Sequence, residues 1–200
     1  MKILNLYAGI GGNRKLWGDE HEVTAVEIDE EIAGVYKSFF PKDKVIVGDA
    51  HQYLLDHYKE FDFIWSSPPC PTHSRMCYSQ KHKVYPNMSL YQEIIFLSNW
   101  FKGKWVVENV IPYYSPLITA TQILGRHCFW SNFPIPKKEF NCIDISRCTP
   151  EELLKFHEIE KPHIKHYRKI VRNMVQCRIG EYIFHQVCNP SIKSTQQKED

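Results

Sequence analysis

Short apolar runs alternate with amphipathic stretches along the first 110 residues of the chain. The apolar runs cover residues 3–6, 23–26, 45–47, 61–65 and 105–107. Helical patterns are predicted between them, at residues 29–39, after residue 49 and at 90–100, with a shorter helix after the first run, through Trp17. Strands that alternate with helices favour βαβ units and a mostly parallel sheet covered by helices on both faces. We therefore predict an α/β fold, with one domain over residues 1–190 and a polar tail at 191–200.

Each apolar run is followed by residues suited to binding or to chemistry. These features are the glycine turn at 9–12, Glu27, Asp49, Cys70 and Glu108. The carboxyl ends of parallel strands meet at one edge of a sheet, and ligands bind there. The sequence therefore predicts that the five features form one site.

The first three features outline a nucleoside pocket. A glycine turn between a strand and a helix lets backbone N–H groups approach a ligand closely. Glu27 is placed to accept hydrogen bonds from ribose hydroxyls, and Asp49 is placed to hold an adenine amino group. Taken alone, either acid is better explained as a helix N-cap or a surface charge. Arg14 stands where a dinucleotide-binding motif would have its third glycine, which disfavours an NAD-type enzyme.

Cys70 and Glu108 are the candidates for chemistry. Pro68 and Pro69 end the fourth run, because proline has no N–H to extend a β-ladder, and they place the Cys70 thiol just beyond the strand. A thiolate attacks carbon well, and partial exposure next to positive charge is expected to lower the pKa of Cys70. Burial is expected to raise the pKa of Glu108, so that its carboxyl can hold a proton for donation. A buried acid that caps a helix or pairs with Arg126 is the alternative for Glu108.

Composition adds exclusions. With 43% hydrophobic and 24% charged residues the chain suits a compact domain with a real core. No apolar run approaches the ~20 residues of a membrane-spanning helix, and the first residues show no signal-peptide cleavage pattern. Seven cysteines are scattered without a C-x-x-C pair, so neither a zinc site nor a redox pair is predicted. We expect a soluble, cytoplasmic protein without a metal.

Charge is distributed unevenly along the chain. Residues 161–178 carry six lysines and arginines and no acid, and a second basic stretch follows Cys70. A solvated helix face is the simpler explanation, and an edge that contacts phosphates is the alternative. The nucleic-acid contacts predicted on the second view are Arg75, Lys81, Lys83, Lys165, Arg168, Lys169 and Arg172.

Five motifs together resemble those of the cytosine-C5 DNA methyltransferases. LNLYAGIGG, AVEID, GDA, SSPPCP and VVENV occur in the order and spacing of that family, over residues 3–110. Beyond them the similarity thins. GRHCFW resembles the family's arginine motif, but Arg126 is followed two residues later by Cys128 in place of a second arginine. TPEELLKF and RNMVQCRIGEYI resemble the closing motifs, with Gln176 where the family has a proline.

The resemblance implies a Rossmann-like fold that binds S-adenosylmethionine and releases S-adenosylhomocysteine. It implies that the Cys70 thiolate adds to C6 of a flipped cytosine in DNA while Glu108 interacts with N3. Asn109 would orient the loop or the base, and Arg126 would lie near the base. The cofactor contacts that it implies are Tyr7, Ala8, Gly9, Ile10, Gly11, Gly12, Glu27, Ile28, Asp49, Ala50, Pro69, Leu90, Asn173 and Val175.

The chain has little material for reading a target sequence. Family members carry a target-recognition domain after the arginine motif, whereas here only a short loop separates Trp130 from Thr149. Alternatives to DNA methylation therefore stay open: an RNA substrate of the tRNA type that is recognised by shape, or a catalytic subunit or non-catalytic module that needs a separate recognition protein. Residues 72–87 are expected to form a loop that closes over the base.

Overall fold

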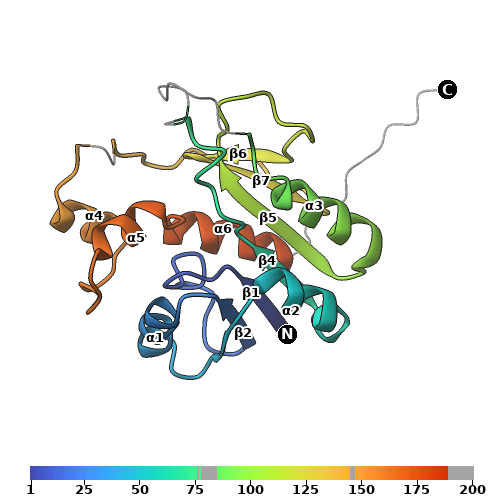
Figure 1. The fold of residues 1–200 in the computed structure, drawn as a ribbon, viewed down its shortest axis with the longest axis horizontal. Helices are drawn as coiled ribbons and strands as arrows, with labels where there is room; N and C mark the ends of the chain where they lie inside the picture. The colour runs from blue at the N-terminus through green and yellow to red at the C-terminus, as the bar shows by residue number, and fades with distance from the viewer. Residues whose placement is uncertain (76, 78–84, 145–146, 189–200) are drawn as a thin grey trace.

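Strands from both halves of the chain join in one sheet (Figure 1). The computed structural model describes residues 1–75, 77, 85–144 and 147–188. Its strands are β1 (Lys2–Leu6), β2 (Glu22–Glu27), β3 (Lys44–Val47), β4 (Phe63–Ser66), β5 (Lys104–Val110), β6 (Gln122–Leu124) and β7 (His127–Ser131). Among the described residues the strand order is β3-β2-β1-β4-β5-β7-β6.

The first five strands are parallel and the last two are not. β1 lies between β2 and β4, and β4 pairs with β5, all in parallel register. β7 runs antiparallel to both β5 and β6, which form its two neighbours. A mostly parallel sheet that ends in an antiparallel hairpin is the Rossmann-like arrangement typical of S-adenosylmethionine-dependent methyltransferases. The predicted fold class is confirmed.

Three of the helices begin at a residue whose side chain caps them. They are α1 (Glu30–Phe39), α2 (Ala50–His57), the short 3₁₀ helix η1 (Tyr58–Glu60), α3 (Ser89–Trp100), α4 (Pro150–Phe156), α5 (Tyr167–Asn173) and α6 (Cys177–Cys188). Asp29 caps α1 by accepting a hydrogen bond from the Ile32 N–H. Thr149 and Glu152 form a capping box at the start of α4.

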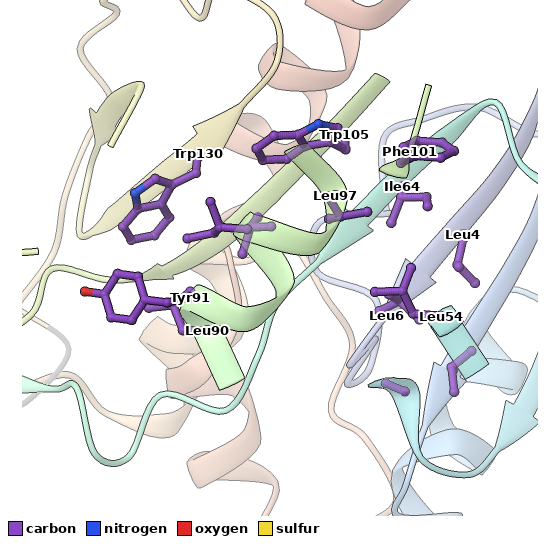
Figure 2. Close-up of a cluster of buried hydrophobic side chains, with 14 of the residues drawn as sticks. Leu4, Leu6, Leu54, Ile64, Leu90, Tyr91, Leu97, Phe101, Trp105 and Trp130 are labelled. Atoms are coloured by element: carbon purple, nitrogen blue, oxygen red, sulfur yellow. The ribbon is translucent and has the colours of Figure 1, made fainter. Parts of the chain in front are cut away.

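Helices pack on both faces of the sheet. Leu54 of α2 and Leu97 of α3 join Leu4 and Ile64 of the sheet in one buried cluster. Figure 2 shows Leu90, Tyr91 and Leu97 of α3 together with strand residues of this cluster such as Leu6 and Ile64. The opposite face packs Phe63 and its neighbours against α6, whose buried residues in that second cluster are Ile179, Ile183 and Phe184. The two layers fix the sheet, and the loops at its carboxyl edge are built on this frame.

The helix predicted through Trp17 is wrong. Residues 12–16 form successive turns, with hydrogen bonds from the Arg14 N–H to Gly11 and from the Trp17 N–H to Arg14. Both bonds reach back three residues, not the four of an α-helix, and Gly11 and Gly18 on either side of the segment have positive φ. Arg14 instead turns inward to a buried ion pair with Asp43, at 2.9 Å.

Two further features bear on the predictions. β5 continues through Glu108 to Val110, because β7 pairs with it that far, so Glu108 lies inside the strand and not beyond it. Residues 132–144 and 147–149, which lead from β7 to α4, form no helix or strand.

The polar tail at 191–200 lies outside the described residues. No helix in the described part of the chain is long and apolar enough to cross a bilayer.

Candidate functional site

The turn after β1 has the backbone conformation that close approach of a ligand requires. Tyr7, Gly9 and Gly11 have φ values of 54°, 55° and 82°. A Cβ added to Gly9 would meet no heavy atom within 4 Å, so open space lies over this part of the turn. Ala8 and Ile10 are buried beneath it. Open space for a ligand therefore lies beside Gly9, whereas the N–H groups of Ala8, Gly9 and Gly11 are already bonded within the chain.

Gly12 serves packing. A Cβ at Gly12 would lie 2.8 Å from the Val175 carbonyl oxygen and 2.8 Å from the Met174 side chain. The chain between α5 and α6 therefore lies directly against the glycine turn. Val175 is buried there, while Asn173 at the end of α5 is exposed. The structure brings Val175 next to Gly12 of the first motif, although about 160 residues separate the two in the sequence.

Glu27 ends β2 beside the same turn. Its Oε2 accepts a hydrogen bond from the Gly9 N–H at 2.9 Å, and its Oε1 accepts from the N–H groups of Ile28 and Asp29. A carboxylate has about four acceptor sites, so these bonds leave capacity for a ligand hydroxyl. Ile28 is 71% exposed and lies next to this carboxylate. Glu27 fits the ribose position, and it also holds the glycine turn to β2.

Asp49 follows β3 and caps α2. Its Oδ1 accepts a hydrogen bond from the Gln52 N–H at 2.8 Å, and the residue is exposed. Ala50 and Leu90, also predicted at the cofactor site, are buried and line the core below. Asp49 is thus an N-cap, as expected for an acid taken alone, and it is close enough to Tyr7 for its charge to raise the pKa of that phenol. The residues at the ends of β1, β2 and β3 fit an adenosyl group.

The Pro-Pro-Cys loop is tied to both neighbouring strands. The Ser67 N–H donates to the Leu6 carbonyl oxygen at 3.2 Å, and Asn109 Nδ2 donates to the Pro68 carbonyl oxygen at 2.8 Å. The Cys70 carbonyl oxygen accepts from the N–H groups of His73 and Ser74, which turns the chain back at the thiol. Cys70 is half-buried and Pro69 is exposed. Asn109 therefore holds the loop.

The expected low pKa of the thiol is wrong for this arrangement. Burial raises the pKa of Cys70, and the nearby Glu108 carboxylate raises it further. Arg126 acts in the opposite direction, but its effect is smaller than that of burial. The positive charge that the sequence suggests is present, and desolvation outweighs it. Cys70 is therefore a thiol at neutral pH until a base or a ligand changes its surroundings.

Glu108 is buried, and burial raises the pKa of its carboxyl to about 7. A hydrogen bond from the Ser67 side chain and the charge of Arg126 oppose this increase without cancelling it. The predicted direction is confirmed. The pKa of about 7 means that the carboxyl is partly protonated at neutral pH, so it can donate a proton.

A histidine that the sequence does not single out lies beside Glu108. His127 Nε2 is 3.6 Å from Glu108 Oε1, and both side chains are buried. Burial and the charge of Arg126 lower the pKa of His127 to about 3, so the ring is neutral. The register places His127 opposite Val110, on the same face of the sheet as Glu108, whereas Cys128 lies opposite Asn109 on the other face. The residue in place of the second arginine therefore points away from Glu108.

Arg126 is the basic residue near both Cys70 and Glu108. It is half-buried, its charge lowers the pKa values of both Cys70 and Glu108, and its Nη2 donates to the Arg172 carbonyl oxygen at 3.4 Å. Arg126 is thus near both candidate catalytic groups, and its side chain also reaches α5. No ion pair between Arg126 and Glu108 occurs among the described residues.

Only some of the basic residues predicted to contact nucleic acid are exposed in the structure. Arg75, Lys165 and Lys169 are exposed. Arg168 is exposed as well, but its Nη2 donates to the Cys148 carbonyl oxygen at 3.0 Å. Arg172 is half-buried at the end of α5. Lys81 and Lys83, with half of the predicted loop at 72–87, lie outside the described residues.

The sequence analysis does not single out one buried acid that lies near the site. Glu93 of α3 is fully buried and bonded to Tyr7 and Ser66. The signal was present in the sequence, because residue 93 shares the face of the helix that carries Leu90, Ile94 and Leu97.

The first 112 residues match a known family. The family model described as "C-5 cytosine-specific DNA methylase" covers residues 1–112, more than half of the chain. No curated protein matches the sequence.

Several solved structures are similar over part of their length. A mutant of DNMT2 from Spodoptera frugiperda is 22% identical, with 80% of this chain and 66% of that chain covered and a TM-score of 0.47. A putative DNA modification methyltransferase encoded within an E. coli prophage is 20% identical, with 57% and 33% covered and a TM-score of 0.41. An S-adenosylmethionine-dependent methyltransferase from Agrobacterium tumefaciens is 16% identical, with 60% and 40% covered and a TM-score of 0.40. The chain thus spans about two thirds or less of the length of these three proteins.

Proposed function

Because the chain belongs to the C-5 cytosine-specific DNA methylase family, we propose that it transfers a methyl group from S-adenosylmethionine to C5 of cytosine in DNA. The observation that carries this proposal is the proximity of the Cys70 thiol to the Glu108 carboxyl. The two groups are close enough for the carboxylate to raise the pKa of the thiol. β4, which leads to Cys70, lies between β5, which carries Glu108, and β1, which leads to the glycine turn.

Cys70 is the nucleophile of the proposed reaction. Its sulfur bonds to C6 of the cytosine, and the electron pair of the C5–C6 double bond moves to C5. Asn109 holds the loop through Pro68, so the thiol keeps a fixed position relative to the sheet. After the methyl group is in place, loss of the C5 proton and departure of the thiolate restore the double bond.

Glu108 supplies the proton that makes this addition favourable. A protonated carboxyl donates to N3, which spreads the negative charge of the adduct into the ring. Arg126 lies near both groups and stabilises the negative charge that the addition creates. The base must leave the duplex to reach this site, at a cost of a few kcal/mol.

The turn after β1 and the acids that follow β2 and β3 would hold the cofactor. Glu27 would accept from a ribose hydroxyl, Asp49 would contact the adenine, and the backbone at Gly9 would lie against the ligand. S-adenosylmethionine, when bound, supplies the methyl group and leaves as S-adenosylhomocysteine. Every other step belongs to residues of this chain.

Replacing Glu27 by alanine should weaken S-adenosylhomocysteine binding by about 1–3 kcal/mol, because charge-assisted hydrogen bonds are lost. Part of the loss comes through Gly9, whose N–H loses its acceptor. Calorimetry measures the change, and Glu22→Ala at the exposed start of the same strand is the control. An unchanged dissociation constant for Glu27→Ala would make it a structural acid only.

The basic residues of α5 and the chain before it are proposed to contact phosphates without reading bases. Lys165 and Lys169 are the cleanest pair to test, because both are exposed, whereas the Arg168 side chain bonds to the Cys148 carbonyl oxygen and Arg172 is half-buried. Replacing both lysines by alanine should weaken binding to all sequences alike and reduce the log–log salt slope by about two.

The matched control removes the same charge at the opposite edge of the sheet. Lys59 and Lys102 are exposed and lie just before β4 and β5, at the amino ends of the strands. Fluorescence anisotropy across a salt series compares the two double variants. Equal losses from both pairs would mean that charge acts non-specifically, and a change in the cytosine that is modified would assign base reading to α5.

RNA is the second candidate substrate. The connection from β7 to α4 holds no helix or strand in its described residues, which leaves little material for reading a DNA groove and suits a substrate recognised by shape. A separate recognition subunit would meet the same need. Incubating the chain alone with labelled S-adenosylmethionine and separate DNA and RNA pools, then locating the label, decides between them. Label at C5 of cytosine in DNA supports the proposal. Label in RNA alone would mean that the substrate is RNA. Transfer that occurs only after a cell extract is added would mean that a separate recognition subunit is needed.

A further inference from the structure

Glu93 is a buried acid in an apolar helix face. It lies in α3 among Leu90, Ile94 and Leu97, and its side chain has no exposure to solvent. Within the described part of the chain its ion-pair partner is a histidine, His51, and no lysine or arginine pairs with it. A buried carboxylate is costly, and an apolar residue of similar volume often serves stability as well or better. The acid therefore needs an explanation beyond packing.

The carboxylate joins three elements that end at the candidate cofactor site. The Tyr7 hydroxyl donates to Oε1 at 2.5 Å, and the Ser66 hydroxyl donates to Oε2. His51 Nδ1 is 3.5 Å from Oε1. Tyr7 follows β1, Ser66 ends β4, and His51 lies in the first turn of α2, two residues after Asp49.

Tyr7 needs such an anchor. It is not a glycine, yet its φ is 54°, in the left-handed region that an L-residue rarely adopts. Burial and the charge of Glu93 raise the pKa of Tyr7 well above its ordinary value, so the hydroxyl stays a donor. The Glu93 contact raises the pKa of His51 as well, and the His51 Nε2 atom is 3.0 Å from Gln92 of the same helix. These contacts hold both side chains toward α3.

We propose that Glu93 is a positioning residue of the cofactor site, whose carboxylate fixes Tyr7 and His51 on two sides of the adenosyl pocket. Glu93 is fully buried, so it acts through these residues and does not touch the ligand. The inference rests on the proposed function, because it assigns the pocket to S-adenosylmethionine.

The test is direct binding of S-adenosylhomocysteine, by calorimetry, to a set of variants. Glu93→Met keeps the length of the side chain and removes both acceptors, so affinity should fall about tenfold. Glu93→Gln keeps one acceptor oxygen and should restore affinity to within about threefold of wild type. Tyr7→Phe should weaken binding in the wild-type background and add less than about twofold in the Glu93→Met background, since the two residues act as one unit.

Ser98→Ala is the matched control for Tyr7→Phe. It also deletes one hydroxyl, from the other end of α3, where Ser98 donates to the Ile94 carbonyl oxygen. Its affinity should equal that of wild type, and thermal unfolding establishes that each variant is folded at the assay temperature. If Glu93→Met does not fold, Tyr7→Phe decides alone: it removes the Tyr7–Glu93 hydrogen bond, and an affinity within twofold of wild type would overturn the positioning role.

The outcomes separate this inference from the proposed function. Wild-type protein that binds no S-adenosylhomocysteine would remove both. Wild-type binding, with Glu93→Met within twofold of it, would overturn the positioning role alone. Fully multiplicative effects of the Glu93 and Tyr7 substitutions would also overturn it, because independent residues do not share one contact.

Discussion

Replacing Cys70 by alanine should abolish methyl transfer and leave S-adenosylhomocysteine binding within a few-fold of wild type. The thiol forms the bond to the base, and without it the ring has no electron-rich C5. The groups proposed to hold the cofactor follow β1, β2 and β3, and their hydrogen bonds do not involve the Cys70 side chain. The loop itself is fixed by Asn109 through Pro68, which the substitution leaves in place.

An activity assay and calorimetry on the same preparation measure the two effects. Cys188→Ala is the control, since Cys188 is an exposed free cysteine at the end of α6, outside the Pro-Pro-Cys loop. Turnover of Cys70→Ala near the wild-type rate would remove Cys70 from the mechanism. Loss of cofactor binding together with activity would mean that the loop, and not the thiol, had been disturbed.

Replacing Glu108 by glutamine should lower kcat/KM by about 10²- to 10⁴-fold and change the shape of the pH profile. The reactive form needs Glu108 protonated and Cys70 ionised. The pKa of Glu108 is about 7, and burial holds the pKa of Cys70 above its ordinary value. Between these two pKa values the abundant form therefore has Glu108 ionised and Cys70 protonated. Both forms carry one proton in total, and their ratio does not change with pH in that interval.

The direction of each limb of the pH profile follows from these protonation states. Below pH ~7 kcat/KM of wild type should rise about tenfold per pH unit, then stay level, and fall above the pKa of the thiol. Glutamine cannot titrate, so kcat/KM of the Glu108→Gln variant should keep rising through pH ~7 until the thiol is ionised. Rates measured from pH 5.5 to 10, with cofactor binding checked at each pH, give the comparison. A variant profile that levels off at the same pH as wild type would assign the lower limb to another group.

The fold and the location of the site could be predicted from the sequence for a physical reason. Parallel strands bury both faces, so the apolar runs are unbroken and easy to find, and their carboxyl ends must meet at one edge. Glu27, Asp49 and the glycine turn follow from that rule alone. The turns at residues 12–16 were predicted as a helix because the residues are compatible with one, while Gly11 and Gly18 set the backbone.

What the sequence could not reveal depends on distances across the sheet. The pKa of Cys70 is set by how deeply the loop packs, and burial there outweighs the charge of Arg126. His127 meets Glu108 only because β7 runs antiparallel to β5 in one particular register. Glu93 was visible as an acid on an apolar helix face, but its partners Tyr7 and Ser66 are 86 and 27 residues away.

The covalent bond between Cys70 and cytosine is the central claim, and trapping it is the most direct test. A fluorine at C5 of the target cytosine cannot leave as a proton does, so the thiolate cannot be expelled and the adduct persists. DNA and RNA that carry 5-fluorocytosine are each incubated with the chain and S-adenosylmethionine, and the modified peptide is identified by mass spectrometry. The account predicts a stable adduct of methylated, fluorinated cytosine on Cys70, formed with DNA and absent from Cys70→Ala. Methyl transfer to unmodified cytosine without any adduct on the fluorinated substrate, or an adduct on another cysteine, would contradict it.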